Sequence, residues 1–410
     1  MMRRWALLAA TTVIFTASSA ALAAKSATDE GGDEAGLDLT LRTKAAAMPV
    51  KTADGSAMES PASHMYLMDF DTGSVLAEKA GDEKMYPSSM TKMMTLYLIF
   101  GELKKGALSL GNQFTVSEHT WVKWNNRGSS MFLPINSQVG LEDLIRGIAI
   151  QSGNDACVVA AEGIAGSEEV FAKQMNEAAK TLGMTNSNFT DSTGWPDPKH
   201  TTTAHDLAVL GAALIRDFPQ YYHYVSEREY SFHGVRQFNR NLLLNNPSLK
   251  VDGIKTGHTD AAGYGITLSA VDPATNRRLV LVVNGLDSTE ARAQEGERLL
   301  RWGFANFHNI SIFNPGQEIG KAKVWMGEAK EVPLTVSAKV MQTFPKVGTS
   351  TAKASISYKS PLIAPIKAGD EVGKLTVTQA DGSAKDYKLV AGGNVEKLGF
   401  FARIPRKLGL

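Results

Sequence analysis

Three short groups of polar residues in this sequence could together transfer an acyl group through a serine. They are Ser89-Met90-Thr91-Lys92, Ser152-Gly153-Asn154 and Lys255-Thr256-Gly257. A serine hydroxyl becomes a strong nucleophile only when a nearby base takes its proton, and a lysine can do so only as the free amine. Residues three apart on a helix share one face, so a helix beginning near Ser89 would bring the Lys92 amine to the hydroxyl.

The second and third groups could supply the further cation, the proton relay and the orienting amide that a serine–lysine pair needs. Burial, the positive end of a helix and a second cation at Lys255 would each favour the uncharged Lys92 amine. The Ser152 hydroxyl could relay a proton, and the Asn154 amide could hold Lys92 or a substrate amide. Gly257, on a predicted strand, would let a ligand backbone approach closely.

None of these groups is specific by itself. An S-x-x-K tetrad should occur by chance about once or twice in a chain of 410 residues. Ser350-Thr351-Ala352-Lys353 also matches, in a β-rich region where no helix is expected. The signal is therefore the ordered set of three groups, with Ser89 at a predicted helix start.

The elements that must position these groups follow from periodicity and turn residues. The helices are expected at Ser89–Lys105, Leu141–Ile150, Ala156–Ile164, Glu168–Leu182 and Thr289–Phe307, and the strands at His64–Phe70, Ser74–Ala77, Ile254–Thr259, Gly263–Val271 and Arg278–Gly285. This order predicts an α+β domain in which a helical cluster packs on an antiparallel sheet. After Asn314-Pro315-Gly316, short Val, Ile and Thr rich runs predict a small all-β domain.

The ordered set resembles the S-x-x-K, S-x-N and K-T-G elements of penicillin-binding proteins and class A β-lactamases. Through Tyr86–Thr95, Gln151–Ala156 and Val251–Thr259 the chain looks like the serine D-alanyl-D-alanine carboxypeptidases, from about His64 to Phe307. The resemblance implies a β-lactamase/transpeptidase-like catalytic domain. It also implies removal of the terminal D-alanine from peptidoglycan stem peptides through an acyl-enzyme, a role in cell-wall biogenesis and cell shape, and covalent inhibition by β-lactam antibiotics.

The same resemblance implies a role for each site residue. Ser89 would be the nucleophile, Lys92 the general base, Ser152 the proton relay and Asn154 an orienting amide. The substrate carboxylate would be bound by Lys255 and Thr256 beside Gly257, together with Arg240. The backbone N–H groups of Ser89 and His258 would form the oxyanion hole. Two alternatives stay open, namely that Arg240 is a surface charge or ion-pair partner and that His258 caps a turn.

Two other functions are compatible with part of this pattern. A class A-like serine β-lactamase needs a carboxylate in a local E-x-x-x-N pattern, and no Glu between Ser152 and Lys255 has Asn four residues later. A non-catalytic peptidoglycan-binding protein would not need Ser89, Lys92, Ser152 and Lys255 intact. Neither a cofactor nor a metal is expected, because the histidines lack metal-ligand spacing and His200 and His205 are expected at the surface. The net charge of +1 gives no reason to expect nucleic acid as a partner.

The chain divides into five predicted segments. These are a signal peptide (1–23), a flexible leader (24–57), the catalytic domain (58–312), the all-β domain (315–398) and a basic amphipathic tail (399–410). Arg3 and Arg4 precede an apolar run and a small-residue cleavage site at Ala21-Leu22-Ala23, so export to the periplasm is expected. The tail could contact the outer face of the inner membrane, or it could pack back onto a domain.

The single cysteine and two tryptophans have predicted positions in the fold. Cys157 is the only cysteine, which excludes an internal disulfide, and it is expected to be a small buried hydrophobe. Trp121 and Trp124 could line the substrate groove or pack in the core.

Overall fold

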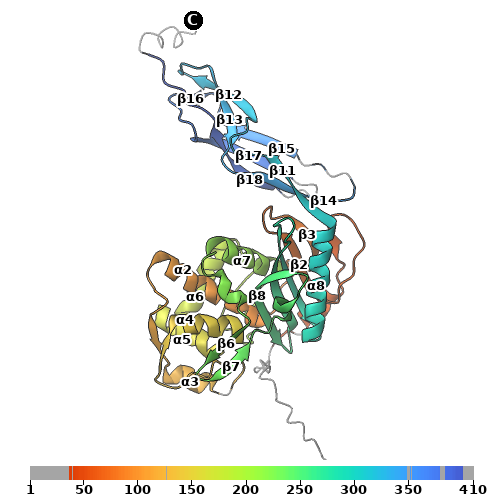
Figure 1. Cartoon of the computed structure of the whole chain (residues 1–410), viewed down its shortest axis with the longest axis vertical. Coiled ribbons are helices and arrows are strands. Elements are labelled where there is room, and N and C mark those ends of the chain that lie inside the picture. The colour runs from red at the N-terminus through yellow and green to blue at the C-terminus, as the bar shows by residue number, and fades with distance from the viewer. Residues whose placement is uncertain are drawn as a thin grey trace, which may run out of the picture.

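The computed structural model describes residues 37–399 except 39, 126, 349–350, 352 and 379–383. The predicted signal peptide, the first part of the leader and the tail beyond Gly399 lie outside the described residues. Figure 1 shows a catalytic part of mixed helices and strands, with a separate strand-rich part extending from it.

An antiparallel sheet forms the centre of the catalytic part. Its strand order is β1-β3-β2-β10-β9-β8. The strands are β1 (Lys51–Thr52), β2 (His64–Asp69), β3 (Val75–Lys79), β8 (Lys250–Thr259), β9 (Gly263–Val271) and β10 (Arg278–Leu286). Alternate side chains of β10 enter different cores: Val280 and Val282 join one apolar cluster, while Leu279, Leu281 and Val283 join the other. Both faces of the sheet are therefore covered.

Helices supply the cover on each face (Figure 1). Helix α8 (Thr289–Asn306) packs on β9 and β10 from one side, and α7 (Ala204–Asp217) packs on β2 and β10 from the other. Helices α2 (Lys92–Lys105), α3 (Glu118–Trp124), α4 (Leu141–Arg146), α5 (Asn154–Ala165) and α6 (Glu168–Leu182) complete the helical cluster, with the small hairpins β4 (Gln113–Thr115) to β5 (Gln138–Gly140) and β6 (Glu229–Phe232) to β7 (Val235–Phe238). Side chains of Ser167, Thr203 and Ser288 cap α6, α7 and α8. Helix α7 was not among the expected elements.

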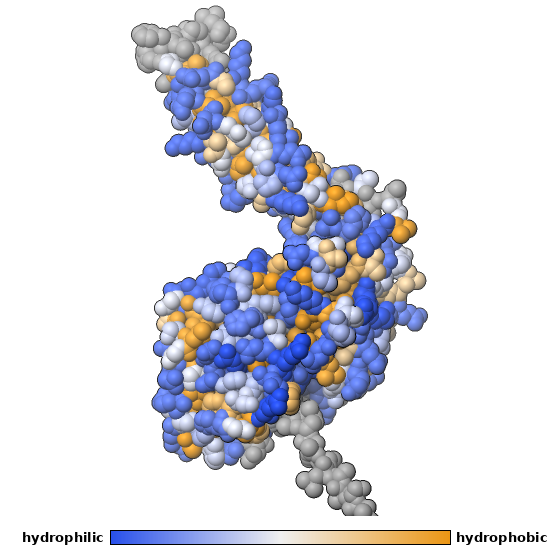
Figure 2. Space-filling model, in the orientation of Figure 1, coloured by the Kyte–Doolittle hydropathy of each residue, from blue (hydrophilic) through white to orange (hydrophobic). Residues whose placement is uncertain are grey.

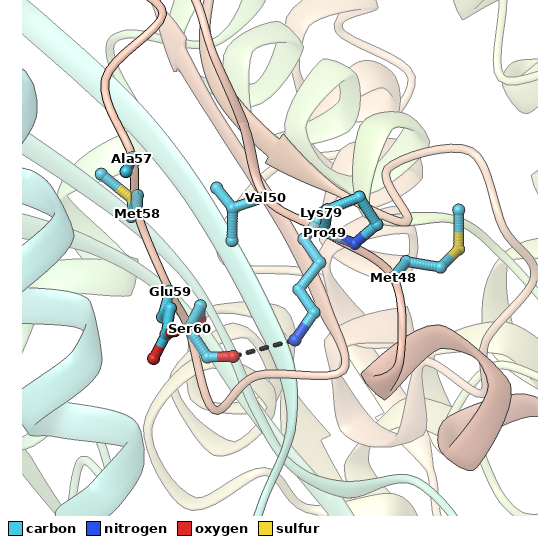
Figure 3. A pocket seen from close by; sticks show the side chains of 8 residues that line it. All are labelled: Met48, Pro49, Val50, Ala57, Met58, Glu59, Ser60 and Lys79. Atoms are coloured by element: carbon cyan, nitrogen blue, oxygen red, sulfur yellow. Dashed lines mark hydrogen bonds between the residues drawn. The ribbon is translucent and has the colours of Figure 1, made fainter.

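The described part of the leader is ordered against the catalytic domain, so the expectation of a flexible segment is wrong for residues 37–57. Helix α1 (Thr40–Ala46) is held by Arg42, whose Nε donates to the Gly285 carbonyl at 3.1 Å. Strand β1 pairs with β3. Residues 48–50, 57–60 and Lys79 border a cavity of about 660 Å³, where Lys79 Nζ donates to the Ser60 carbonyl at 2.8 Å (Figure 3).

The C-terminal part consists of strands around a core of its own. One sheet has the order β15-β17-β18-β13-β12-β16. Its strands are β12 (Gly320–Trp325), β13 (Glu331–Val336), β15 (Lys353–Tyr358), β16 (Leu362–Ile363), β17 (Glu371–Thr378) and β18 (Ala384–Ala391). A two-stranded ribbon of β11 (Phe307–Phe313) and β14 (Val340–Pro345) connects it to the catalytic part. The surface in Figure 2 is mainly hydrophilic and narrows at this connection.

Buried polar groups fasten the ribbon to the end of β2. The Asp69 carboxylate is fully buried and accepts hydrogen bonds from Arg277 Nε at 2.7 Å and from Asn309 Nδ2 at 3.0 Å. Arg277 Nη1 also donates to the Phe307 carbonyl at 2.8 Å. The Thr343 and Thr72 hydroxyls are 2.6 Å apart. The Asn309 side chain and the Phe307 carbonyl therefore attach the ribbon to a buried ion pair, in which Arg277 Nη2 has no hydrogen-bond partner among the described residues.

Candidate active site

The first motif forms a short turn and the start of a helix. Residues Ser88–Thr91 make one 3₁₀ turn, and α2 follows at Lys92, as is frequent at helix N-termini. Ser89 is 3% exposed and Lys92 is fully buried. Lys92 Nζ donates to Ser89 Oγ at 2.7 Å, which is the contact that the helical spacing predicts.

The second motif follows an irregularity in the helical cluster. Helix α4 continues into one π-helical turn, Gly147–Gln151, and Ser152 then adopts a left-handed conformation with φ 63°. Such turns and conformations are costly for a non-glycine residue and are concentrated at functional sites. Helix α5 begins at Asn154, whose buried Nδ2 has no hydrogen-bond partner among the described residues. A buried amide in that state leaves a donor for a substrate.

The third motif lies on β8, an edge strand of the sheet. Lys255 is 3% exposed, and its Nζ donates to Ser152 Oγ at 2.9 Å and to the Thr256 carbonyl at 3.1 Å. A Cβ on Gly257 would lie 2.9 Å from the Pro87 carbonyl oxygen. The glycine therefore lets β8 lie against the turn that carries Ser89, whereas the sequence suggested that it makes room for a ligand.

Of the predicted carboxylate-binding residues, Arg240, Thr256 and Gly257 line one cavity of about 200 Å³, whereas Lys255 is not part of its wall. Arg240, Thr256, Gly257 and His258 share its wall with Leu242, Tyr264, Thr289 and Arg292. Arg240 Nη1 donates to Ser129 Oγ at 2.7 Å, and the His258 and Tyr264 rings stack with centroids 3.8 Å apart. The Arg240 guanidinium beside Thr256 suits a carboxylate, since arginine presents several donors to its two oxygens.

Arg292 and Ser129 support this cavity, and sequence reasoning missed both. Arg292 Nη1, on α8, donates to the carbonyls of Gly257 at 3.3 Å and Gly265 at 3.2 Å. Ser129 accepts from Arg240 through its hydroxyl and from the Asn154 N–H, at 2.8 Å, through its carbonyl. No motif in the sequence marks either residue, because each acts through contacts between distant segments.

A loop between α6 and α7 contributes the second partner of Lys92. The amine donates to the Thr193 carbonyl at 2.8 Å, so the contact with Asn154 that the sequence suggested is replaced by a main-chain contact. Three residues after Lys92 on α2 a similar contact follows: Thr95 Oγ1 donates to the Ser192 carbonyl at 2.6 Å. A main-chain acceptor has no side-chain signature, so no sequence signal could have found it.

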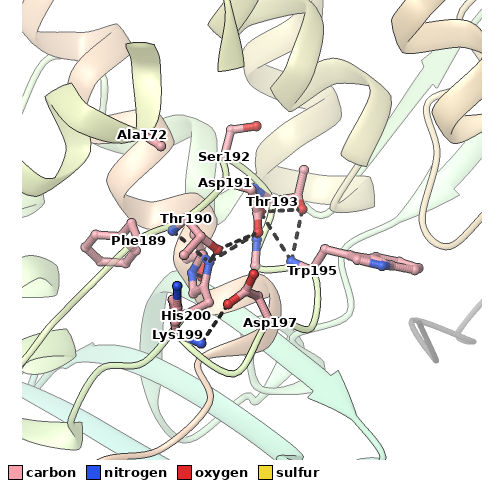
Figure 4. A network of polar contacts seen from close by, with 12 residues as sticks. Ala172, Phe189, Thr190, Asp191, Ser192, Thr193, Trp195, Asp197, Lys199 and His200 are labelled. Carbon is pink, nitrogen blue, oxygen red and sulfur yellow. Dashed lines mark hydrogen bonds and ion pairs between the residues drawn. The ribbon is translucent and has the colours of Figure 1, made fainter. Parts of the chain in front are cut away.

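His200, expected at the surface, is 2% exposed, and that expectation is wrong. Its Nε2 lies 2.9 Å from Thr91 Oγ1, and its Nδ1 lies 3.2 Å from Asp191 Oδ2 (Figure 4). Burial raises the pKa of the Asp191 carboxyl, but the His200 imidazole and hydrogen bonds from Thr193 outweigh it and hold the pKa well below its ordinary value. Asp191 is therefore a carboxylate at neutral pH.

The remaining expectations concern packing. Trp124 is 1% exposed and packs edge to face against Trp195 with centroids 4.9 Å apart, so it belongs to the core, and with Trp121 it borders a cavity of about 130 Å³. Cys157 is fully buried on α5, and burial raises the pKa of its thiol to about 12, which makes it an inert hydrophobe. Lys353 of the competing tetrad lies in strand β15. Ser350 lies outside the described residues.

Two family models match the chain. The model of D-alanyl-D-alanine carboxypeptidases matches residues 49–288, and the model of the penicillin-binding protein 5 C-terminal domain matches residues 307–397. D-alanyl-D-alanine carboxypeptidase DacC of Escherichia coli strain K12 is 40% identical over 363 residues, which cover 87% of this chain and 90% of the relative.

Solved structures agree with these matches. Penicillin-binding protein 5 from Haemophilus influenzae superposes with a TM-score of 0.75 at 36% identity, covering 83% of this chain and 99% of that one. Penicillin-binding protein D2 from Listeria monocytogenes, in its cefotaxime-bound form, gives a TM-score of 0.52 at 26% identity, covering 61% and 99%. The expected fold, an α+β catalytic domain followed by an all-β domain, is confirmed.

Proposed function

The chain belongs to the D-alanyl-D-alanine carboxypeptidase family, and from that membership we propose how its residues carry out the reaction. The protein is a penicillin-binding serine carboxypeptidase, as the ordered motifs predicted. The observation that carries the residue assignment is the buried contact of 2.7 Å between Lys92 Nζ and Ser89 Oγ, with Lys255 Nζ 2.9 Å from Ser152 Oγ. The Ser89 and Ser152 hydroxyls therefore each accept a hydrogen bond from a different lysine.

Acylation begins at Ser89. Its Oγ attacks the carbonyl carbon of the penultimate D-alanine while Lys92 takes the hydroxyl proton. The developing oxyanion is bound by the N–H groups of Ser89 and His258, as in other acyl-transfer sites. The proton that Lys92 took passes through the Ser152 hydroxyl to the departing amine, so that the terminal D-alanine leaves as a neutral amine and Lys92 is again a free amine. Water then attacks the Ser89 ester and gives a proton to Lys92, which returns it to Ser89 Oγ as the shortened peptide is released.

Substrate recognition is assigned to the wall of the cavity beside β8. Arg240 and the Thr256 hydroxyl border it, and Lys255 lies one residue before Thr256 on the same strand. Together they fit the terminal carboxylate that distinguishes a carboxypeptidase substrate from an internal peptide. The unpaired Asn154 amide fits a backbone carbonyl on the acyl side of the scissile bond. Penicillin carries a carboxylate at the equivalent end and enters the same site.

Mass spectrometry after benzylpenicillin treatment, combined with turnover of a pentapeptide ending in D-Ala-D-Ala, tests the assignment. The adduct is expected on Ser89, and a Ser89→Ala variant should form no adduct and release no D-alanine while unfolding at a similar temperature. A Ser350→Ala variant, which disrupts the other S-x-x-K tetrad, is the matched control and should react normally. An adduct on Ser152 or Ser350, or turnover by Ser89→Ala, would contradict the proposal. Fast penicillin hydrolysis without D-alanine release would favour a β-lactamase instead.

The enzyme family acts in the bacterial cell wall, and we place this chain in the periplasm after removal of residues 1–23. The support is the charged, apolar and small-residue order at the N-terminus. N-terminal sequencing of the protein from a periplasmic extract should begin near Ala24. A first residue of Met1 in that extract would refute the cleavage.

Peripheral membrane contact is assigned to the tail, residues 399–410, of which 400–410 lie outside the described residues. Within the described chain, no helix combines the length and the apolar character that a bilayer crossing requires. Val395 is 3% exposed and the Leu398 N–H donates to the Met326 carbonyl at 2.9 Å, so a clean truncation must spare these residues. Full-length protein and a chain ending at Gly399 should differ in flotation with anionic liposomes at low salt. Equal, poor flotation of both would exclude the tail as a contact.

A further inference from the structure

We propose that Asp191 and His200 form a positioning pair that aims the Thr193 carbonyl at the Lys92 amine before the reaction starts. The inference rests on the proposed role of Lys92 as the general base. It assigns a task to two residues outside the three motifs, in the loop between α6 and α7 shown in Figure 4.

The direction of the Thr193 carbonyl is fixed from the opposite side of its own peptide unit. A trans peptide points its C=O and its N–H in opposite directions. The Gly194 N–H, which belongs to the same unit as the Thr193 carbonyl, donates to Asp191 Oδ1 at 2.8 Å. The carbonyl must then point away from Asp191, and there it accepts from Lys92 Nζ at 2.8 Å.

The preceding peptide unit obeys the same rule. The Thr193 N–H donates to Asp191 Oδ1 at 2.7 Å, which turns the Ser192 carbonyl toward Thr95 Oγ1 at 2.6 Å. Thr95 lies on α2, three residues after Lys92, on the same helix face. One carboxylate oxygen therefore orients two successive carbonyls onto α2, through the N–H groups of Thr193 and Gly194.

His200 fixes Asp191 relative to the catalytic turn. Its ring spans the gap between Asp191 Oδ2, 3.2 Å from Nδ1, and Thr91 Oγ1, 2.9 Å from Nε2. Thr91 directly precedes Lys92, so the imidazole connects the carboxylate to the helix start that carries the base. Gly194 tightens the arrangement, because a Cβ there would lie 1.8 Å from the Ser88 carbonyl oxygen.

The consequence for the reaction concerns charge. When Ser89 loses its proton the Lys92 amine becomes an ammonium ion, and a carbonyl dipole already aimed at it stabilises that charge without reorganisation. A loosened loop would let the carbonyl turn away and would slow acylation. Binding of the substrate, which depends on residues of β8 and on Arg240, would change little.

A purely structural role for the loop is the competing explanation, and Asn176 provides its control. Asn176 Nδ2 donates to the Phe189 carbonyl at 2.7 Å and its Oδ1 accepts from the Phe189 N–H at 2.9 Å. Asn176 thus holds the same loop at Phe189, and none of these hydrogen bonds involves α2. Asn176→Ala should lower the unfolding temperature and leave the chemistry intact.

The experiment uses the full chain and stopped-flow acylation by benzylpenicillin, resolved into the dissociation constant of the first complex and the acylation rate constant. Asp191→Ala should reduce the rate constant by about 10- to 100-fold, the scale of a misplaced catalytic group, with less than about a threefold change in the dissociation constant. Asp191→Asn retains an oxygen acceptor for both N–H groups and should recover part of the loss. His200→Gln should fall between wild type and Asp191→Ala.

The outcomes are distinguishable. An Asp191→Ala rate constant within about threefold of wild type, or a loss equal to that of Asn176→Ala, overturns the positioning role. If Asp191→Ala does not fold, the rate constants of Asp191→Asn and His200→Gln decide, and wild-type values in both overturn it. Failure of wild-type enzyme to form a Ser89 adduct would instead refute the proposed function from which the inference starts.

Discussion

Replacing Gly194 by alanine tests how closely the loop must approach the turn that carries Ser89. Gly194 has φ +83°, and an added Cβ would meet the Ser88 carbonyl oxygen at 1.8 Å and Thr91 Oγ1 at 2.7 Å. Both neighbours belong to the turn and neither is a flexible chain end. Protein interiors are packed too densely to absorb this, so the loop and the turn must separate by roughly 1 Å.

Gly183 offers a matched comparison. It has φ +80° and nothing within 4 Å of an added Cβ. Gly183→Ala and Gly194→Ala therefore share the cost of a left-handed alanine, roughly 1–2 kcal/mol. They differ only in the contact with the catalytic turn, so their difference isolates that contact.

The expected result is a large difference in chemistry. A displacement of about 1 Å at a catalytic group can cost about 100-fold in rate, so Gly194→Ala should be acylated by benzylpenicillin about 100-fold more slowly than wild type. Gly183→Ala should stay within about threefold, since Gly183 only ends α6. Stopped-flow acylation and thermal unfolding of both variants provide the measurement. Equal acylation rates in the two variants would refute the claim that the loop is packed on the turn.

Three further predictions follow from other contacts. Lys255→Ala removes the cation that donates to Ser152 Oγ and should lower kcat/KM for a D-Ala-D-Ala peptide by about 100-fold or more, since truncating a buried charged partner costs about 2–5 kcal/mol; near-normal turnover would exclude the assignment. Ser129→Ala removes the hydrogen bond from Arg240 Nη1 to the Ser129 hydroxyl and should raise KM by about threefold to tenfold with kcat nearly unchanged, whereas a fall in kcat alone would contradict a binding role. Burial lowers the pKa of His64 from 6.5 to about 4. As the pH falls from 6.5 to 4, the unfolded chain therefore binds a proton at His64 that the folded chain does not bind. The free energy of unfolding should fall by up to about 3 kcal/mol over this range. Thermal unfolding between pH 7 and pH 4.5 should therefore show a smaller loss in His64→Leu than in wild type, and parallel curves would refute it.

Local patterns were enough to predict several elements and the three motifs. The expected helix Glu168–Leu182 has the bounds of α6, and the strand expected at Gly263–Val271 has those of β9. Each is specified by residues within itself and by turn residues at its ends. The chemistry of Ser89 and Lys92 was equally visible, because both partners lie within one helical turn.

Helix α7 illustrates what local patterns could not provide. Most of its side chains are buried, from Leu207 to Ile215, against strands and helices that only the folded chain brings to it. The burial of His200 could not be predicted for another reason. It depends on contacts with Thr91 and Asp191, and only the folded chain brings these residues together. The Thr193 contact is carried by a main-chain atom, which every residue possesses.

The ribbon of β11 and β14 determines how the molecule would respond to twisting. The chain leaves α8 and enters the ribbon at Phe307, and a single covalent crossing would let one part swivel about the other. Asn309 on β11 and Thr343 on β14 are tied to β2 and the turn after it, and Lys385 Nζ on β18 donates to the Asp71 and Thr72 carbonyls, both at 3.1 Å. Hydrogen bonds from three strands resist this rotation, which a single covalent connection would allow. Because the two parts cannot rotate freely, any surface that binds the all-β domain would also fix the direction from which a peptide can reach Ser89.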